Sequence, residues 1–551
     1  MKNCLTRLAA TVVLFGCVSA LPVAASPQTH LEAAIDELLQ HHPSELLGLH
    51  WHAMQPNQQD HIIASVYHEN GLQPVWVTSG GPGERAEVIY RVLANAVHEG
   101  LVAEDYNVTD IGSLWDSREP FNLARLDILL TAGLVDYVSD LRHGRVQPKN
   151  AEQAVFYHAA DRDINAPAIV AEAMKSSDLE SYLAAQLPSH ERYRNTRGGL
   201  ARYRQIAANG GWPTVNPGET IHPGEQDERL ATIRQRLLAT GDLQQPATRD
   251  MSYDPATVTA VKLFQQRHGL DDDGVIGQAT ISAMNVPVEQ RIRQLEINLE
   301  RWRWLTRDLG ERHVLVDIPA FEAATFDSGE ELYNMRVIVG KHHHETPVFS
   351  DTIKYVVINP YWTITPSIAR HEMLPKLRRD PSYLAKKNIS LFRGWSDNKE
   401  IDPRTIDWNK VTPKQMNQYR LRQNPGPGNA LGTLKIVFPN KYSVYLHDTP
   451  NHNLFERTER AFSHGCIRMS EPVRQAALVL GDAGAGWSEE RIADIVKTGQ
   501  RTVVRLEQPV QVHLTYQTAL ADADHRVRFV PDFYQRDARL ERALYGDDAL
   551  L

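Results

Sequence analysis

The sequence predicts a multidomain α+β protein with three parts: an N-terminal helical scaffold, a small three-helix module, and a β-sandwich-like domain that carries a capping insertion. The chain has 551 residues, which is too long for one ordinary hydrophobic core. Apolar residues recur at steps of three and four up to about Ala208, as in helices. From His313 onward they fall instead in short runs rich in β-branched residues. The composition, with 42% hydrophobic and 23% charged residues, is typical of folded protein.

Residues 1–25 have the pattern of a signal peptide. Lys2 and Arg7 supply a basic start, an apolar stretch follows, and small residues up to Ala25 offer a cleavage site. Lipidation at Cys17 is a second option, less favoured because Phe15 is bulky for such a site. No later apolar run is long enough to span a bilayer. We therefore expect a mature protein that is soluble, exported and close to the cell envelope.

Residues 26–215 are predicted to form the helical scaffold. Its clearest helix closes at Gly144, with Arg142 and His143 in the last turn, as helix C-termini prefer. The apolar positions that define this helix are Leu123, Leu126, Leu130, Leu134, Tyr137, Val138 and Leu141. No cluster in this region has a spacing that indicates a metal site or an acid–base pair. The scaffold is expected to end near residues 210–213, which have the composition of a linker.

Residues 226–290 predict three short helices. The first ends at Gly241, and the second begins at Asp254-Pro255, with the carboxylate as N-cap and proline at the first helical position. The third helix runs from about Thr280 and is followed by Asn285. The connecting segments are Gly269-Leu270 and Asp273-Gly274-Val275-Ile276-Gly277. This pattern resembles the peptidoglycan-binding module of bacterial cell-wall enzymes. A plain helical linker domain is the alternative, because short motifs constrain function loosely.

Residues 305–551 are predicted to form a domain of many short strands with turns between them, which favours a β-sandwich. The strand candidates are 314–316, 336–339, 355–358, 434–438, 443–446, 502–504 and 510–514. Between about 366 and 428 the pattern changes to charged, helix-like sequence. We predict that this segment is a capping insertion that could fold over the site as a lid.

Cys466 is the most informative residue of the chain. The sequence has three cysteines, and both Cys4 and Cys17 lie in the predicted signal peptide. An exported protein left with one cysteine cannot form an intramolecular disulfide, so the thiol needs another explanation. A buried structural cysteine is the plain alternative. Burial alone gives no reason for the flanking Ser-His-Gly or for a distal His-Asp pair, so we predict a catalytic nucleophile.

A nucleophilic thiolate needs a base or a positive field beside the sulfur. The expected base is His447, which lies 466 − 447 = 19 positions upstream, at the end of a predicted strand that would fix its ring. His464 is predicted to be structural or orienting, because neighbouring residues in a turn often point apart. The group that orients His447 stays open between Asp448 and a backbone carbonyl.

The residues around the cysteine predict a turn suited to acyl transfer. Gly465 can adopt backbone angles that other residues resist, which would leave the amides near Cys466 free to face an oxyanion. Ser463 is predicted to bind or orient the substrate. Arg468 offers a planar donor fork that suits a substrate carboxylate.

The run Ser463-His464-Gly465-Cys466-Ile467-Arg468, together with His447-Asp448, resembles the active-site signature of the L,D-transpeptidases, whose catalytic domain is of the YkuD type. The run from Tyr445 to Phe455 is similar to the large Gram-negative YcbB-like branch. Members of that branch join a signal-led helical scaffold, a peptidoglycan-binding module and a catalytic domain with a capping insertion. The same three parts are predicted above from the residues of this chain.

The resemblance implies a specific reaction. Cys466 would attack the carbonyl of the L,D bond between the third and fourth residues of a peptidoglycan stem, with release of D-alanine. The thioester would then pass to the diaminopimelate amine of a neighbouring stem and give a 3→3 cross-link. His447 would act as general base and acid, and the amides of Gly465 and Cys466 would form the oxyanion hole. Arg468 would lie near the substrate.

The resemblance also implies the setting of this reaction. The protein would work in the periplasm without a metal or organic cofactor. Its partners would be peptidoglycan tetrapeptide stems, as donor and acceptor, and other cell-wall synthases. The net charge of −9 argues against a chain built around nucleic acid. Three alternatives stay open: an L,D-carboxypeptidase, an enzyme that links a lipoprotein to peptidoglycan, and a non-catalytic scaffold that binds the cell wall.

Two other groups of residues invite a function and are assigned none. His342-His343-His344 is expected to be an exposed loop, because loop residues rarely converge on one metal ion without a distant partner. His371-Glu372 lacks the second histidine of a metalloprotease helix. Trp302 and Trp304 are expected to pack between domains and not to stack on sugar rings.

Overall fold

The computed structural model describes residues 26–49, 51, 56–151, 155, 164–244, 250–396, 398–481 and 486–546. The predicted signal peptide and the alternative lipidation site at Cys17 lie outside these residues. Over the described residues, none of the helices combines the length and the apolar character needed to cross a bilayer.

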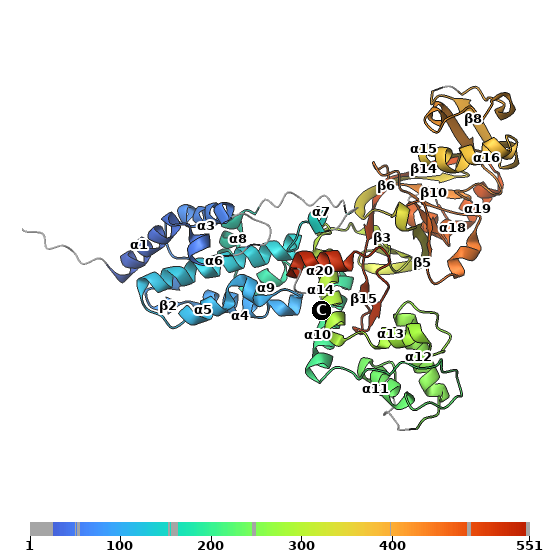
Figure 1. Cartoon of the computed structure of the whole chain (residues 1–551). Helices are drawn as coiled ribbons and strands as arrows, with labels where there is room; N and C mark the ends of the chain where they lie inside the picture. Colours follow the sequence, from blue (N-terminus) through green and yellow to red (C-terminus); the bar gives the residue numbers. More distant parts are fainter. Residues whose placement is uncertain are drawn as a thin grey trace, which may run out of the picture.

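Helices form the N-terminal part, as predicted, and they pack around α6 (Figure 1). This helix spans Pro120–His143 and ends at Gly144, whose φ of 77° places it in a conformation that favours glycine. Asp127 lies fully buried within α6 and accepts hydrogen bonds from the hydroxyl of Tyr67 and from three backbone amides of residues 75–77. The other helices of this part are α1 (Pro27–Gln40), α2 (Pro43–Leu46), α3 (Pro56–Glu69), α4 (Glu84–Ala94), α5 (Val108–Leu114), α7 (Pro148–Ala151), α8 (Ala166–Lys175), α9 (Leu179–Ala184) and α10 (Glu191–Ala208). A short hairpin pairs β1 (Val77–Thr78) with β2 (Gly81–Pro82).

Three helices follow where the sequence predicts them: α11 (Leu230–Thr240), α12 (Pro255–Arg267) and α13 (Gln278–Met284). The side chain of Asp254 caps α12 by accepting from the backbone N–H of Thr257 at 2.8 Å. Apolar side chains of these helices share one small core. The long helix α14 (Val288–Arg303) then leads from this module to the strands of the following domain and packs against α10.

The C-terminal part is built on one nine-stranded sheet, with the order β12-β5-β13-β11-β10-β6-β14-β3-β4. A further pairing between β4 and β5 closes the sheet on itself, so the predicted sandwich-like domain encloses its core within one curved sheet. The strands are β3 (Arg312–Asp317), β4 (Glu322–Asp327), β5 (Glu330–Gly340), β6 (Phe349–Ile358), β10 (Leu434–Val437), β11 (Leu446–His447), β12 (Ala461–Ser463), β13 (Ile467–Met469) and β14 (Thr502–Thr515). The helices α18 (Pro472–Leu480) and α19 (Glu489–Lys497) pack beside them.

Several strands differ from the prediction, and β4, β12 and β13 were not predicted. The segments 502–504 and 510–514 form one strand, β14, whose pairing with β6 shifts register between Arg505 and Val510. The strand predicted at 443–446 is reduced to β11, because Ser443 has a φ of 59°, outside the range of a strand. The side chain of Asn440 bonds to backbone groups of residues 438–444 and holds this segment in a turn.

The segment between β6 and β10 folds around its own small core. It contains α15 (Pro366–Ile368), the π-helical turn Ala369–Met373, α16 (Leu374–Arg379) and α17 (Tyr383–Lys386). Its strands β7 (Trp362–Thr363), β8 (Ile389–Arg393) and β9 (Tyr419–Gln423) form a separate three-stranded sheet. Figure 1 shows β8, α15 and α16 together at one end of the molecule, beyond β10 and β14.

The chain ends in a segment that returns to α14. It comprises the hairpin of β15 (Ala519–Ala521) with β16 (Val527–Phe529), followed by α20 (Asp537–Tyr545). In Figure 1, α20 lies beside α14, close to the junction of the helical part and the sheet. The C-terminal segment therefore connects the helical part with the domain that carries the site.

Candidate active site

Three neighbouring strands place the predicted site residues on one face of the sheet. His447 of β11 lies in register with Lys435 of β10 on one side and with Arg468 of β13 on the other. Paired residues share a face of a sheet, and the residues that alternate with them, Leu446 and Ile467, point into the core. Cys466 immediately precedes β13. The fold thus brings together residues that are up to 33 positions apart, from 435 to 468.

His447 is held in the tautomer that a general base needs. Its Nδ1 lies 2.5 Å from the backbone carbonyl oxygen of Asp448. A carbonyl oxygen can only accept, so Nδ1 carries the hydrogen and Nε2 is left with a lone pair. Burial, together with the positive charges of Arg468 and Lys435, lowers the pKa of His447 to about 3, so the ring is neutral at physiological pH.

The Asp448 carboxylate has a different task. It accepts hydrogen bonds from the backbone N–H of Thr433 at 2.7 Å, from the Thr433 hydroxyl at 2.8 Å, and from the backbone N–H of Thr449 at 2.6 Å. Of the two orienting groups that the sequence left open for His447, the structure therefore has the backbone carbonyl. The carboxylate holds the chain that supports this carbonyl.

Cys466 is half-buried at the edge of this cluster. Its Sγ lies 3.6 Å from the carbonyl oxygen of Ser443, toward which the thiol donates. Loss of water around the sulfur raises the pKa of Cys466, while hydrogen bonds from Tyr445 and the charges of Lys435 and Arg468 act in the opposite direction. The net shift is upward, so the resting group is a thiol. Because His447 is neutral, the resting pair is a thiol and an imidazole, not an ion pair.

Tyr445 is a site residue that the sequence analysis missed. Its side chain hydrogen-bonds to Cys466, and burial and this contact raise its pKa well above the usual value. The ring centroid of Tyr445 lies 5.6 Å from that of His447, and the Lys435 ammonium lies 3.6 Å from the Tyr445 centroid. The signal for Tyr445 was its position two residues before His447, which is on the same side of an extended chain.

The turn before Cys466 is fixed by Ser463. The Ser463 hydroxyl donates to the carbonyl oxygen of Cys466 at 2.5 Å and accepts from the N–H of Gly465 at 3.0 Å. The Gly465 amide is therefore occupied, which contradicts the expectation that it faces an oxyanion. The N–H of Cys466 has no acceptor within the described part of the chain and stays available for that role. Gly465 has a φ of 106°, which favours glycine.

His464 points to the insertion and not to the sulfur. Its Nε2 lies 2.7 Å from Oε1 of Glu372, which belongs to the π-helical turn of the insertion. Its ring also packs at 4.8 Å from that of His344. His464 thus connects the turn that carries Cys466 with two other segments, and its predicted orienting role stays a prediction.

Arg468 places a cation beside the sulfur. The guanidinium is half-buried, and burial lowers its pKa while Cys466 raises it. Its Nε is buried without a hydrogen-bond partner among the described residues. The group retains donors for a negatively charged ligand.

The other groups noted in the sequence lie elsewhere. No cluster of metal-ligating side chains is found among the described residues. The side chains of His342, His343 and His344 are exposed, as expected. Trp302 and Trp304 are buried, and Trp302 stacks on His190 at 5.1 Å, so both pack inside the protein. A cavity of about 530 Å³ between α10, α12, β4 and β15 contains neither Cys466 nor His447.

Three segments of the chain match known protein families. Residues 311–504 match the family described as "L,D-transpeptidase catalytic domain", residues 226–284 match "Putative peptidoglycan binding domain", and residues 61–200 match "Scaffold domain". A curated relative from Haemophilus influenzae, called "Putative L,D-transpeptidase", is 33% identical over 230 residues. That alignment covers 42% of this chain and 45% of the relative, so the match spans less than half of either protein.

Two solved structures were also matched. The L,D-transpeptidase (residues 123–326) from Xylanimonas cellulosilytica is 14% identical, with 54% of this chain and 98% of that chain covered and a TM-score of 0.17. A fused Zn-dependent amidase/peptidase/peptidoglycan-binding protein from Clostridium acetobutylicum is 10% identical, with 54% and 100% covered and a TM-score of 0.15. TM-scores this low do not establish a shared architecture.

Proposed function

We propose that this chain, which contains an L,D-transpeptidase catalytic domain at residues 311–504, forms 3→3 cross-links in peptidoglycan through a thioester on Cys466. The observation that carries the proposal is that His447 and Arg468 are paired on adjacent strands and Cys466 immediately precedes β13, with the imidazole fixed in its Nδ1–H form. Binding alone has no use for a thiol beside an oriented base.

The first half-reaction begins with the neutral thiol and imidazole. As Cys466 Sγ attacks the carbonyl carbon of the L,D bond, its proton passes to Nε2 of His447. The carbonyl oxygen becomes an oxyanion, which the N–H of Cys466 stabilises. When the tetrahedral intermediate collapses, His447 gives its proton to the departing amine, and D-alanine leaves. The donor stem is then held as a thioester.

The second half-reaction reverses these roles. The side-chain amine of diaminopimelate on a neighbouring stem attacks the thioester, and His447 accepts a proton from that amine. Sγ leaves and recovers a proton from His447, so the thiol and the neutral imidazole are restored. Lys435 and Arg468 favour negative charge that develops on the sulfur, and Arg468 has donors suited to a substrate carboxylate.

The remaining parts of the chain suit the same task. The module at residues 226–284 would hold the enzyme near peptidoglycan, and a signal peptide would deliver it to the periplasm, where other cell-wall synthases would work beside it. The insertion would lie over the bound stems and limit access of water, with His464 and Glu372 as its contact to the catalytic turn.

One alternative follows from a specific observation. Cys466 is half-exposed, so water could reach the thioester and give an L,D-carboxypeptidase. The deciding experiment is mass spectrometry of muropeptides after the purified protein is incubated with tetrapeptide-containing fragments. Cross-linked dimers support the proposal, and tripeptides alone support hydrolysis. Transfer to a lipoprotein in place of a stem would favour the linking enzyme, and the absence of any product with intact binding would favour a scaffold.

A further inference from the structure

The loop between β5 and β6 lies directly behind the turn that carries the nucleophile. Thr346 of this loop is fully buried. Its hydroxyl donates to the carbonyl oxygen of Gly465 at 2.9 Å and accepts from the N–H of Gly340 at 2.9 Å. One side chain therefore connects the end of β5 with the residue that precedes Cys466.

The bond to Gly465 has a consequence on the other side of the same peptide unit. The carbonyl of Gly465 and the N–H of Cys466 belong to one planar trans peptide, in which they point in opposite directions. A hydrogen bond that fixes the carbonyl therefore also fixes the direction of the N–H. Ser463 already holds the Gly465 N–H and the Cys466 carbonyl. Within the described residues, the Cys466 N–H has no hydrogen-bond acceptor and stays available for a substrate oxygen.

Thr346 is itself held by the C-terminal segment. The hydroxyl of Tyr534 accepts from the N–H of Thr346 at 3.0 Å and donates to the carbonyl oxygen of Gly340 at 2.5 Å. Next to it, Arg536 pairs with Glu345 at 2.6 Å. The C-terminal segment thus holds this loop at two neighbouring residues, through the side chain of Glu345 and through the backbone N–H of Thr346.

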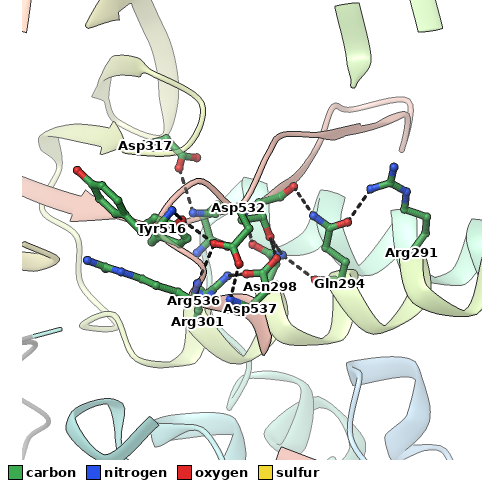
Figure 2. A network of polar contacts seen from close by, with 12 residues as sticks. Arg291, Gln294, Asn298, Arg301, Asp317, Tyr516, Asp532, Arg536 and Asp537 are labelled. Atoms are coloured by element: carbon green, nitrogen blue, oxygen red, sulfur yellow. Dashed lines mark hydrogen bonds and ion pairs between the residues drawn. The ribbon is translucent and has the colours of Figure 1, made fainter. Parts of the chain in front are cut away.

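The C-terminal segment is in turn fixed to α14 (Figure 2). Asp537 accepts from Arg301 of α14 at 2.6 Å, and the hydroxyl of Tyr516 donates to Asp532 at 2.6 Å. Tyr516 also accepts from the N–H of Tyr534 at 2.9 Å. These contacts set the position of Tyr534 relative to the sheet.

We propose that Thr346, supported by Tyr534, is a positioning residue that directs the Cys466 N–H toward the oxyanion formed during acyl transfer. This inference rests on the acyl-transfer chemistry proposed above. The proposed role of Thr346 predicts different effects on two reactions of Cys466, acylation and alkylation. Attack on a carbonyl needs the oriented N–H, because an oxyanion forms. Alkylation by iodoacetamide displaces iodide without forming an oxyanion, so it needs only the sulfur.

The experiment compares these two reactions in the full chain. Acylation is followed by release of p-nitrophenolate from p-nitrophenyl acetate, with Cys466→Ala as the background, and alkylation by mass spectrometry with iodoacetamide. We expect Thr346→Val to slow acylation at least about tenfold, toward the roughly 10²–10³-fold of a lost oxyanion donor. Its alkylation rate should stay within about twofold of wild type. Thr346→Ser, which keeps the hydroxyl, should restore acylation.

Tyr534→Phe should also lower the acylation rate relative to the alkylation rate, by a smaller factor than Thr346→Val. Its matched control is Tyr67→Phe, which also removes a buried hydroxyl with two hydrogen bonds, at 2.7 and 2.9 Å, but in the helical part. The control should leave both rates unchanged. If Thr346→Val does not fold, as judged by circular dichroism, the Tyr534→Phe and Tyr67→Phe pair decides. The proposal would be overturned if the wild type and Thr346→Val had equal acylation rates. It would also be overturned if Thr346→Val lost acylation and alkylation by the same factor.

This test does not depend on peptidoglycan. A wild-type protein that the ester acylates, but that forms no muropeptide product, would refute the proposed function and leave the role of Thr346 standing. On cross-linking substrates, the Thr346→Val variant should lose kcat with little change in KM, because an oxyanion contact acts in the transition state only. A rise in KM alone would contradict the assignment.

Discussion

The protonation state of the catalytic pair can be tested by the pH dependence of thiol labelling. Burial holds the pKa of Cys466 above its ordinary value of 9.0. No more than about 1% of the thiol is then ionised at pH 7, because the thiolate fraction falls roughly tenfold for each pH unit below the pKa. The rate of alkylation at pH 7 should therefore be at most about 1% of its plateau at high pH.

The assay measures pseudo-first-order labelling by iodoacetamide from about pH 6 to 10. We expect the logarithm of the rate to rise with a slope of about one, and to level off only above the ordinary thiol range. Arg468→Met should move the midpoint of the pH profile of labelling to a higher pH, because the charge of Arg468 lowers the pKa of Cys466. His447→Ala should label at wild-type rate near pH 10, yet lose cross-linking by about 10²–10⁴-fold.

One result would refute this reasoning. A labelling rate that is flat between about pH 5 and 8, and that drops in His447→Ala, would indicate a thiolate–imidazolium pair at rest. That result would mean that the pKa of His447 lies far above the value of about 3 that its burial produces.

Three further outcomes are expected. Cys466→Ala should abolish thioester formation and cross-linking while changing the free energy of unfolding by no more than about 1 kcal/mol, measured by denaturant titration, since the thiol is half-exposed. Acid should destabilise the fold: burial lowers the pKa values of His190, His447 and His513 to about 3, 3 and 4, so below pH 6.5 the unfolded chain binds more protons than the folded one. Proton uptake at each of these histidines in the unfolded chain then lowers the free energy of unfolding by up to about 2 kcal/mol at pH 5. An equal free energy of unfolding at pH 5 and 7.5 would contradict this. Glu372→Gln should weaken the contact of the insertion with His464 and lower the ratio of muropeptide dimers to tripeptides by about two- to fivefold, whereas Glu400→Gln, an exposed change in the same insertion, should not.

Sequence patterns predicted the helices well because their signals are local. Asp254 caps α12 and Gly144 closes α6 through contacts within one turn of each helix, which a short stretch of sequence contains in full. The strand at 443–446 was predicted too long for the same reason. Its β-branched and aromatic residues favour a strand, but the Asn440 side chain holds the preceding backbone in a turn.

The candidate site was predicted in part. Cys466, His447 and Arg468 stand out by residue type and spacing, and the fold brings them together. The occupied Gly465 amide was not predictable, because it depends on the rotamer of Ser463. The contact between Thr346 and Tyr534 could not be predicted from the sequence, since the two residues are 188 positions apart and neither has a residue type that indicates chemistry. The catalytic roles and the domain boundaries stay predictions.

The closure of the sheet through β4 and β5 bears on behaviour outside catalysis. An open sheet ends in strands whose unpaired N–H and C=O groups can recruit a strand from another chain, which is a route to aggregation. Among the described residues of the nine-stranded sheet, the ring of paired strands leaves only the short β12, Ala461–Ser463, as an edge strand. This nine-stranded sheet thus offers other chains little template for edge-to-edge pairing, whereas the open three-stranded sheet of the insertion keeps β7 and β8 as its edges.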